Sequence, residues 1–138
     1  MSSARRVYLD TGVLISAFRG EDELANRALE VLDDPDVCLV LSEYVRLEVL
    51  PKPIFHKNLS EERFLQEVIG VSECIESTRE IRDQAFTLAC TYYLNTIDAL
   101  HVSAAIAAKV DEIITLENST KPMCNVREIV VRSLRDAG

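Results

Sequence analysis

Short apolar segments that alternate with segments of helical periodicity constrain this chain more than any other feature of its sequence. Residues 7–9, 37–41 and 113–115 are runs of mostly apolar side chains, typical of strands buried on both faces of a sheet. Between these runs, apolar residues recur every three or four positions, as in helices packed against a sheet. The alternation predicts an α/β fold with a parallel sheet covered by helices on both faces, and a last edge strand at 129–131.

Residues that cap or break helices predict where the helices begin and end. Four positions carry the signals of a helix start: Ser42, Ser60, the capping-box sequence at 77–80, and Thr96. Two prolines, Pro51 and Pro53, are expected to end the helix that Ser42 starts near Leu50, because proline disfavours a helical conformation in the residue before it.

The length of 138 residues is that of one domain, because a single hydrophobic core typically serves about 100–200 residues. We expect a single domain over residues 1–138 with its core at about 7–131. No apolar run approaches the roughly 20 residues that span a bilayer. The N-terminal segment contains Asp10 and lacks a small-residue cleavage site, so we read no signal peptide and expect a cytoplasmic protein.

The net charge of -8, from 15 basic and 23 acidic residues, at first argues against a nucleic-acid partner. The acidic excess is local, however. Residues 21–36 hold seven acidic residues against Arg27 alone, a net charge of -6, which leaves only -2 for the rest of the chain. The simplest interpretation of this segment is a solvated helix face.

The four cysteines contain no Cys-x-x-Cys pair and are far apart in sequence, at Cys38, Cys74, Cys90 and Cys124. This spacing argues against a zinc site or a disulfide framework. Each cysteine has apolar or small neighbours, so we expect all four to be buried in the core.

Four carboxylates are candidates for a shared site. Asp10 directly follows the first predicted strand, and Glu117 lies two residues beyond the end of a later one. Asp98 falls in the first turn of its predicted helix, whereas Glu48 stands in an otherwise apolar helical stretch six residues after Ser42. In parallel sheets, ligands bind beyond the carboxyl ends of the strands, so several of these acids are expected at one edge.

Each acid also has a simpler interpretation. Asp10 could only cap a helix, Asp98 could only complement a helix dipole, Glu48 could pair with a surface base, and Glu117 could be an ordinary loop residue. A cluster of three or four acids without basic partners is nevertheless costly unless a cation binds it. Mg²⁺ takes oxygen ligands, which points to metal-assisted phosphodiester hydrolysis.

The motifs around these acids resemble those of the PIN-domain nucleases, and within them the VapC-like toxins of bacterial and archaeal toxin–antitoxin pairs. Residues 7–15, Val-Tyr-Leu-Asp-Thr-Gly-Val-Leu-Ile, look like the family's first strand ending in Asp-Thr or Asp-Ser. Ser42 followed by Glu48 is similar to the second motif, residues 98–105 closely resemble the third, and residues 113–117 look like the fourth.

The resemblance implies a three-layer α/β/α sandwich with a central mainly parallel sheet, Mg²⁺ or Mn²⁺ as cofactor, and hydrolysis of RNA. Carried over by position, the catalytic carboxylates would be Asp10, Glu48, Asp98 and Glu117. Asp10 and Asp98 would hold the metal, and the hydroxyl groups of Thr11 and Thr115 would line the site.

Three positions near these motifs qualify the resemblance. Gly12 stands where the family often has Asn, so one polar contact is missing, and Glu117 is one methylene longer than the common Asp. His101, one turn from Asp98, could act as a general acid or base, but we expect a packed residue that hydrogen-bonds near the site.

RNA binding requires positive or aromatic side chains near the acids. The candidate cations are Arg46, Lys52 and Lys57, together with Arg19 and Arg63, and the candidate stacking residues are Tyr44 and Phe55. The resemblance further implies a homodimer and a small antitoxin that covers the acidic cleft.

Two other functions remain open on the sequence. One is a PIN-like module that binds RNA or protein without cleavage. The other is a phosphatase or phospho-receiver domain, which also places an Asp after the first strand but needs a second acid there, where this chain has Gly12.

Overall fold

A five-stranded sheet forms the centre of the molecule in the computed structural model, which describes residues 4–136. The strand order is β3-β2-β1-β4-β5, and every pair of neighbours is parallel. The strands are β1 (Arg5–Leu9), β2 (Val37–Ser42), β3 (Glu73–Ile75), β4 (Glu112–Thr115) and β5 (Val131–Ser133). The all-parallel sheet confirms the predicted α/β class.

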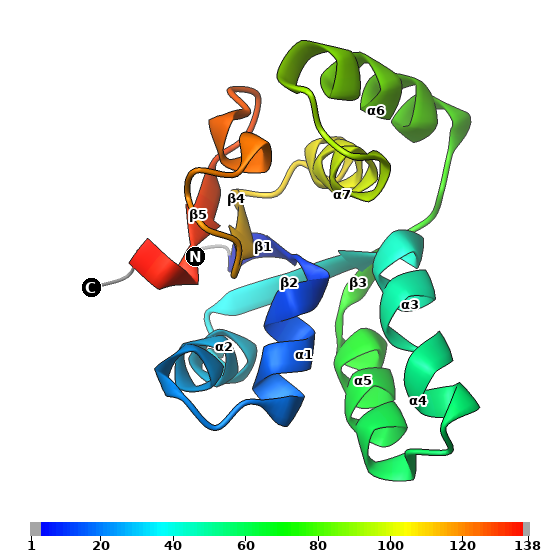
Figure 1. The fold of residues 1–138 in the computed structure, drawn as a ribbon, viewed down its shortest axis with the longest axis vertical. Helices are drawn as coiled ribbons and strands as arrows, with labels where there is room; N and C mark the ends of the chain where they lie inside the picture. The colour runs from blue at the N-terminus through cyan, green and yellow to red at the C-terminus, as the bar shows by residue number, and fades with distance from the viewer. Residues whose placement is uncertain (1–3, 137–138) are drawn as a thin grey trace.

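Helices cover both faces of the sheet. Figure 1 shows α6 and α7 on one face, α1, α2 and α5 on the other, and α3 and α4 beside α5. The α-helices are α1 (Thr11–Arg19), α2 (Glu23–Asp33), α3 (Glu43–Val49), α4 (Pro51–Phe55), α5 (Leu59–Val71), α6 (Arg79–Tyr92) and α7 (Thr96–Ala107), with short 3-10 turns at Pro122–Asn125 and Leu134–Asp136. This is the predicted three-layer α/β/α arrangement.

The three central strands, β1, β2 and β4, carry the core. Val7, Tyr8 and Leu9 of β1 are at most 1% exposed, because helices lie on both sides of the strand. Burial on both faces explains why these strands are continuous apolar runs rather than alternating ones. Such burial also fixes the carboxyl ends of β1, β2 and β4 at one edge of the sheet, which is where the predicted site residues begin.

Several helix boundaries differ from the predictions. Asn58 and Asn95, rather than Ser60 and Thr96, cap α5 and α7, and each accepts a hydrogen bond from the backbone N–H three residues on. Asn, Ser and Thr are all favoured at the position that caps a helix, so residue type alone could not show which of the neighbouring residues is the cap.

The helix that Ser42 caps, α3, ends at Val49 with Leu50 as its C-cap, directly before Pro51, as predicted. Pro51 then opens α4, because a proline at the first helical position loses no hydrogen bond, and Pro53 lies within α4 rather than ending a helix.

The last strand and the cysteines also correct the sequence predictions. The edge strand β5 is Val131–Ser133, two residues later than predicted at its start. The expectation of buried cysteines is wrong: Cys74 and Cys90 are exposed, and Cys38 and Cys124 are half-buried. Cys74 lies on the three-residue edge strand β3, where few side chains are covered. All four are free thiols.

The acidic segment 21–36 forms the exposed side of α2 and the turns that flank it, as predicted. No helix within residues 4–136 has the length and apolar character required to cross a membrane.

Candidate active site

Asp10 is held rigidly where β1 ends and α1 begins. Its Oδ1 atom accepts a hydrogen bond from the Thr11 N–H at 2.8 Å, and its Oδ2 atom accepts one from the Thr115 hydroxyl at 2.8 Å. The Asp10 backbone N–H also donates to Ile114 O of the adjacent strand β4. With only 7% of its surface exposed, Asp10 is fixed by two neighbouring parallel strands.

Asp98 lies in the first turn of α7, where the helix dipole favours an anion. Its backbone N–H donates to Oδ1 of the cap residue Asn95 at 2.8 Å. Burial raises the pKa of the Asp98 carboxyl group, and the negative charge of Asp10 raises it further. Glu117 and Glu48 add smaller contributions in the same direction, while a charge on His101 would oppose them. The four predicted acids therefore act on one another electrostatically.

Glu48 reaches the site from α3 and contacts α7 through His101. Its Oε1 atom lies 2.5 Å from Nε2 of His101, and its side chain is 33% exposed. His101 is 1% exposed, and its other ring nitrogen, Nδ1, lies 2.7 Å from the Tyr8 hydroxyl group. The prediction of a packed, hydrogen-bonded histidine near the acids is confirmed. The alternative that Glu48 pairs with a surface base is not what the structure shows.

Glu117 is the most loosely held of the four acids. Its backbone N–H donates to the Thr115 hydroxyl oxygen at 3.0 Å, and its carbonyl oxygen accepts from the Ser133 hydroxyl. Its carboxylate lies 3.8 Å from Nζ of Lys121, and its side chain is 46% exposed. The backbone is thus tied to the same threonine that orients Asp10, while the carboxylate faces solvent and a lysine.

Within residues 4–136, no Lys or Arg forms an ion pair with Asp10, Glu48 or Asp98. In the same range, no three His, Cys, Asp or Glu side chains are arranged closely enough to form a metal site as they stand. The donor chemistry nevertheless fits a hard divalent cation, because carboxylate oxygens repel one another here and have no cationic partner.

The sequence of residues 7–121 matches the family model for the PIN domain. This chain belongs to the PIN-domain family. The match spans all four motifs that carry the predicted acids. No curated protein matches the chain at a significant level.

Solved structures with the same fold as this PIN domain include toxin–antitoxin proteins. The VapBC2 complex of Rickettsia felis bound to a promoter DNA fragment aligns with a TM-score of 0.71 and 16% identity, over 93% of this chain and 98% of that chain. A toxin–antitoxin complex from Klebsiella pneumoniae aligns at 0.69 and 24%, over 90% and 95%. VapC20 of Mycobacterium tuberculosis, a toxin that cleaves the sarcin–ricin loop, aligns at 0.64 and 11%, over 89% and 98%.

The predicted RNA-binding residues of this PIN domain are dispersed. Arg46, Lys52 and Lys57 are all exposed, on α3, on α4 and in the turn after α4. Arg19, at the carboxyl end of α1, pairs with Glu61 at 2.8 Å. It stands one nine-residue helix length, roughly 13 Å, from Asp10.

The two candidate stacking residues differ in exposure. Tyr44 is only 8% exposed, and its hydroxyl group hydrogen-bonds Ser77 at 2.7 Å, so it cannot stack on a base. Phe55 is 80% exposed and remains available.

Gly12 has space for a side chain. A Cβ atom built there would meet Leu116 Cβ at 3.9 Å, an ordinary van der Waals contact, and the residue has no positive φ. The absence of the family's Asn therefore reflects neither a steric nor a backbone requirement at this position.

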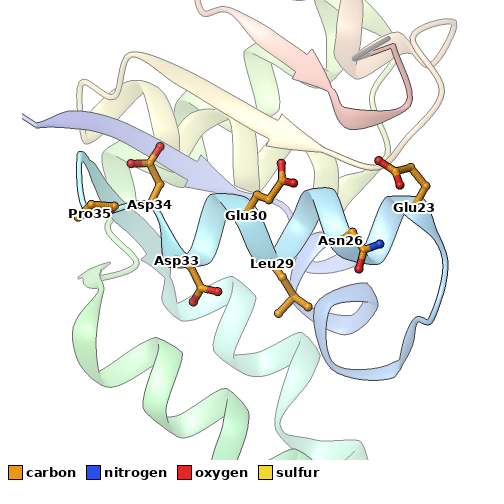
Figure 2. A pocket seen from close by; sticks show the side chains of 7 residues that line it. All are labelled: Glu23, Asn26, Leu29, Glu30, Asp33, Asp34 and Pro35. Carbon is orange, nitrogen blue, oxygen red and sulfur yellow. The ribbon is translucent and has the colours of Figure 1, made fainter.

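One surface hollow lies away from the acids. It has a volume of about 570 Å³ and lies along α2, where Figure 2 shows Glu23, Glu30 and Asp34 around it. None of the four predicted site carboxylates lines it. Its lining is the solvated acidic segment, and it contributes nothing to the site at the carboxyl edge of the sheet.

Sequence reasoning missed Tyr8 and Ser42 as members of the site's surroundings. Tyr8 is a buried strand residue and Ser42 a helix cap, and both descriptions are correct. Their hydroxyl groups lie 2.6 Å apart, and Tyr8 in turn reaches His101. The signal available in the sequence was a polar Tyr within an otherwise apolar strand, because a buried hydroxyl group needs a partner.

Proposed function

We propose that this PIN domain is a Mg²⁺- or Mn²⁺-dependent endoribonuclease that acts as a VapC-like toxin. The observation that carries the proposal is that three carboxylates, Asp10, Glu48 and Asp98, share one sheet edge with no Lys or Arg ion pair among residues 4–136. Such an arrangement costs stability, because like charges disfavour one another's ionised forms. A bound cation removes that cost.

Asp10 and Asp98 are the residues that would hold the cation. When bound, it would offset charge on the phosphate and lower the pKa of a water molecule. Thr11 and Thr115 keep both oxygens of Asp10 in place by donating one hydrogen bond to each. These two bonds fix the orientation of the Asp10 carboxylate before a cation binds.

Glu48 and Glu117 would act on water and substrate beside Asp98, whose pKa both of them raise. Glu48 uses Oε1 to accept from His101, and no hydrogen bond within residues 4–136 engages its Oε2. Glu117 has a half-exposed carboxylate that would act on the site through a water molecule. The two residues would orient the attacking water and accept its proton.

The partners we propose follow from the family. VapC20 cleaves an RNA loop, and the Rickettsia felis and Klebsiella pneumoniae structures are toxin–antitoxin complexes. By analogy of fold, we propose RNA as the substrate, a small antitoxin as the partner, a homodimer as the assembly and the cytoplasm as the location.

Cleavage of a mixed pool of RNA tests the proposal. The wild-type protein should cleave the pool with Mg²⁺ or Mn²⁺ and not with EDTA, and Asp98→Asn should lower the rate at least about 100-fold, because it removes a metal-binding charge. Asp83→Asn, an exposed acid on α6, is the matched control and should cleave like the wild type. Equal rates for all three proteins would contradict the proposal.

The second candidate function is a PIN-like module that binds RNA or protein without cleaving RNA. It is favoured by the absence, within residues 4–136, of three acids in metal-binding geometry. Tight RNA binding that persists in EDTA, with no cleavage under any divalent ion, would support this function instead.

A further inference from the structure

An unbroken series of hydrogen bonds runs from the amino end of α3, through the core, to Glu48. The Val45 N–H donates to Ser42 Oγ at 3.4 Å, Ser42 Oγ lies 2.6 Å from the Tyr8 hydroxyl, and that hydroxyl lies 2.7 Å from His101 Nδ1. The series ends where His101 Nε2 lies 2.5 Å from Glu48 Oε1. Ser42, Tyr8 and His101 are each at most 1% exposed, so bulk solvent does not reach these hydrogen bonds.

The two ends of this series determine the direction of every hydrogen bond in it. A backbone N–H can only donate, and an ionised carboxylate can only accept. With one proton for each link, Ser42 donates to Tyr8, Tyr8 donates to Nδ1 of His101, and Nε2–H of His101 donates to Glu48. The opposite direction leaves the Ser42 hydroxyl proton without an acceptor in the core, which is costly.

The phenol of Tyr8 is suited to the donor role. Tyr8 is fully buried, and its hydroxyl oxygen lies 2.6 Å from Ser42 Oγ and 2.7 Å from His101 Nδ1, so its single proton can bond to only one of them. Because Ser42 donates to Tyr8, the phenol presents its proton to Nδ1. The tilted packing of the two rings, with centroids 5.7 Å apart, keeps the imidazole of His101 in this orientation.

We propose that Tyr8 and Ser42 hold His101 as the Nε2–H tautomer, and that His101 thereby fixes one oxygen of Glu48 and leaves the other free for the reaction. Tyr8, Ser42 and His101 are thus positioning residues for Glu48. The catalytic consequence rests on the proposed nuclease function, whereas the tautomer and the order of the hydrogen bonds do not.

The reason Glu48 needs positioning is its location. Glu48 lies on α3 with a third of its side chain exposed. Asp10, by contrast, caps α1, and Asp98 lies in the first turn of α7. A free glutamate on such a helix samples several rotamers, and restricting it costs side-chain entropy. His101 lies on α7 only three residues from Asp98. The hydrogen bond from its Nε2 therefore holds Glu48 of α3 in a fixed position relative to α7, the helix that carries Asp98.

A pair of phenylalanine variants tests the proposal. Tyr8→Phe and Tyr44→Phe each delete one hydroxyl bonded to a serine, at 2.6 and 2.7 Å. The bond of Tyr8 is buried and that of Tyr44 part-buried, and only Tyr8 contacts His101. Nitrogen-15 NMR of the histidine ring should show the Nε2–H tautomer in the wild type at pH 7.5. In Tyr8→Phe the Nδ1 resonance should move to that of an acceptor without a hydrogen bond, and in Tyr44→Phe it should not move.

Kinetics give the second readout. Tyr8→Phe should lower kcat about 10-fold with KM for RNA unchanged, as is typical when a residue behind a site is removed, and Tyr44→Phe should leave both constants unchanged. His101→Leu should lose more activity than Tyr8→Phe, and His101→Gln should recover part of it, because a glutamine amide can still donate to Glu48.

Two results would overturn the proposal: a proton on Nδ1 in the wild type, or a Tyr8→Phe protein whose Nδ1 resonance stays in place. If the folded wild type cleaves no RNA with any divalent ion, the proposed function fails instead. In that case the nitrogen resonances alone decide whether the tautomer assignment holds.

Discussion

Acidic side chains at the two ends of the sheet have opposite electrostatic surroundings. At the amino end, Glu112 is 3% exposed and bound by the guanidinium groups of both Arg5 and Arg132. Burial alone would raise the pKa of Glu112, but these two arginines outweigh it and lower the pKa. At the carboxyl end, burial and neighbouring acids raise the pKa of Asp98, and within residues 4–136 no arginine or lysine pairs with it.

Other acids at the amino end of the sheet are also bound by an arginine. The side chain of Arg6 pairs with Glu73 at 2.5 Å, and its backbone N–H donates to Asp111 at 2.8 Å. The chain thus neutralises acids where they serve only the fold. Asp10, Glu48 and Asp98 have no such Lys or Arg partner among residues 4–136, and this contrast supports the proposal that the carboxyl end is the functional one, because a bound ligand can compensate their charge.

Removing the charge of Glu112 should give the larger effect on stability. Glu112→Gln loses two ion pairs at a buried position, and we expect the free energy of unfolding to fall by about 1–3 kcal/mol at pH 7, below the full cost of a buried pair because both arginines are half-exposed. Urea unfolding of this variant, with Glu67→Gln on the exposed side of α5 as control, measures it. Similar stability in both variants would remove the contrast between the two ends.

The pH dependence of this effect has a definite sign. The pKa of Glu112 is lowered in the folded state, so its contribution is present above the ordinary value of 4.5 and is lost as the pH falls through the folded pKa. The difference between wild type and Glu112→Gln should therefore shrink in acid.

Basic residues on and just after α4 should contribute more to RNA affinity than those that precede β4 and β5. Lys52→Ala/Lys57→Ala should weaken binding several-fold and make the dependence of log K on log salt less steep by about 1.4, because each single-strand phosphate that a lysine neutralises contributes about 0.7 to the slope. Lys109→Ala/Arg127→Ala, on exposed segments that precede β4 and β5, is the control. The same affinity for the Lys52/Lys57 variant and the wild type across a salt series would refute this role.

Asp98→Asn should give the smallest effect on stability, and one of opposite sign to Glu112→Gln. Because the pKa of Asp98 is raised in the folded state, its ionised form destabilises the fold. Without metal, the variant should melt at a slightly higher temperature than the wild type at pH 7, and this gain should disappear as the pH falls below the folded pKa of Asp98. A lower melting temperature at pH 7 would show that Asp98 is not under repulsion.

Much of the fold was predictable because the central strands are buried on both faces. The runs at 7–9, 37–41 and 113–115 need no tertiary information to be recognised, and the elements between them could only be crossover helices. The short edge strand β5 was misplaced, because three residues with one covered face carry little periodic signal. Helix starts at Asn58 and Asn95 were missed, because several adjacent residues can cap equally well.

The candidate site was predictable only in part. Asp10 is placed by its strand and Asp98 by its helix start, so both positions follow from local sequence. The contact between Glu48 and His101 joins residues 53 apart, and that between Tyr8 and His101 joins residues 93 apart. Such pairings depend on how α3 and α7 pack over the end of the sheet, and a single sequence carries no record of that packing.

The most direct test of the account is the change in melting temperature on adding millimolar Mg²⁺ or Mn²⁺. The account predicts that the metal raises the melting temperature of the wild type by several degrees and leaves that of Asp10→Asn/Asp98→Asn unchanged, because only the wild type has paired charges for the cation to bind. The proposed metal site would be contradicted if neither ion changed the melting temperature of the wild type, or if the melting temperature of the double variant rose as much as that of the wild type.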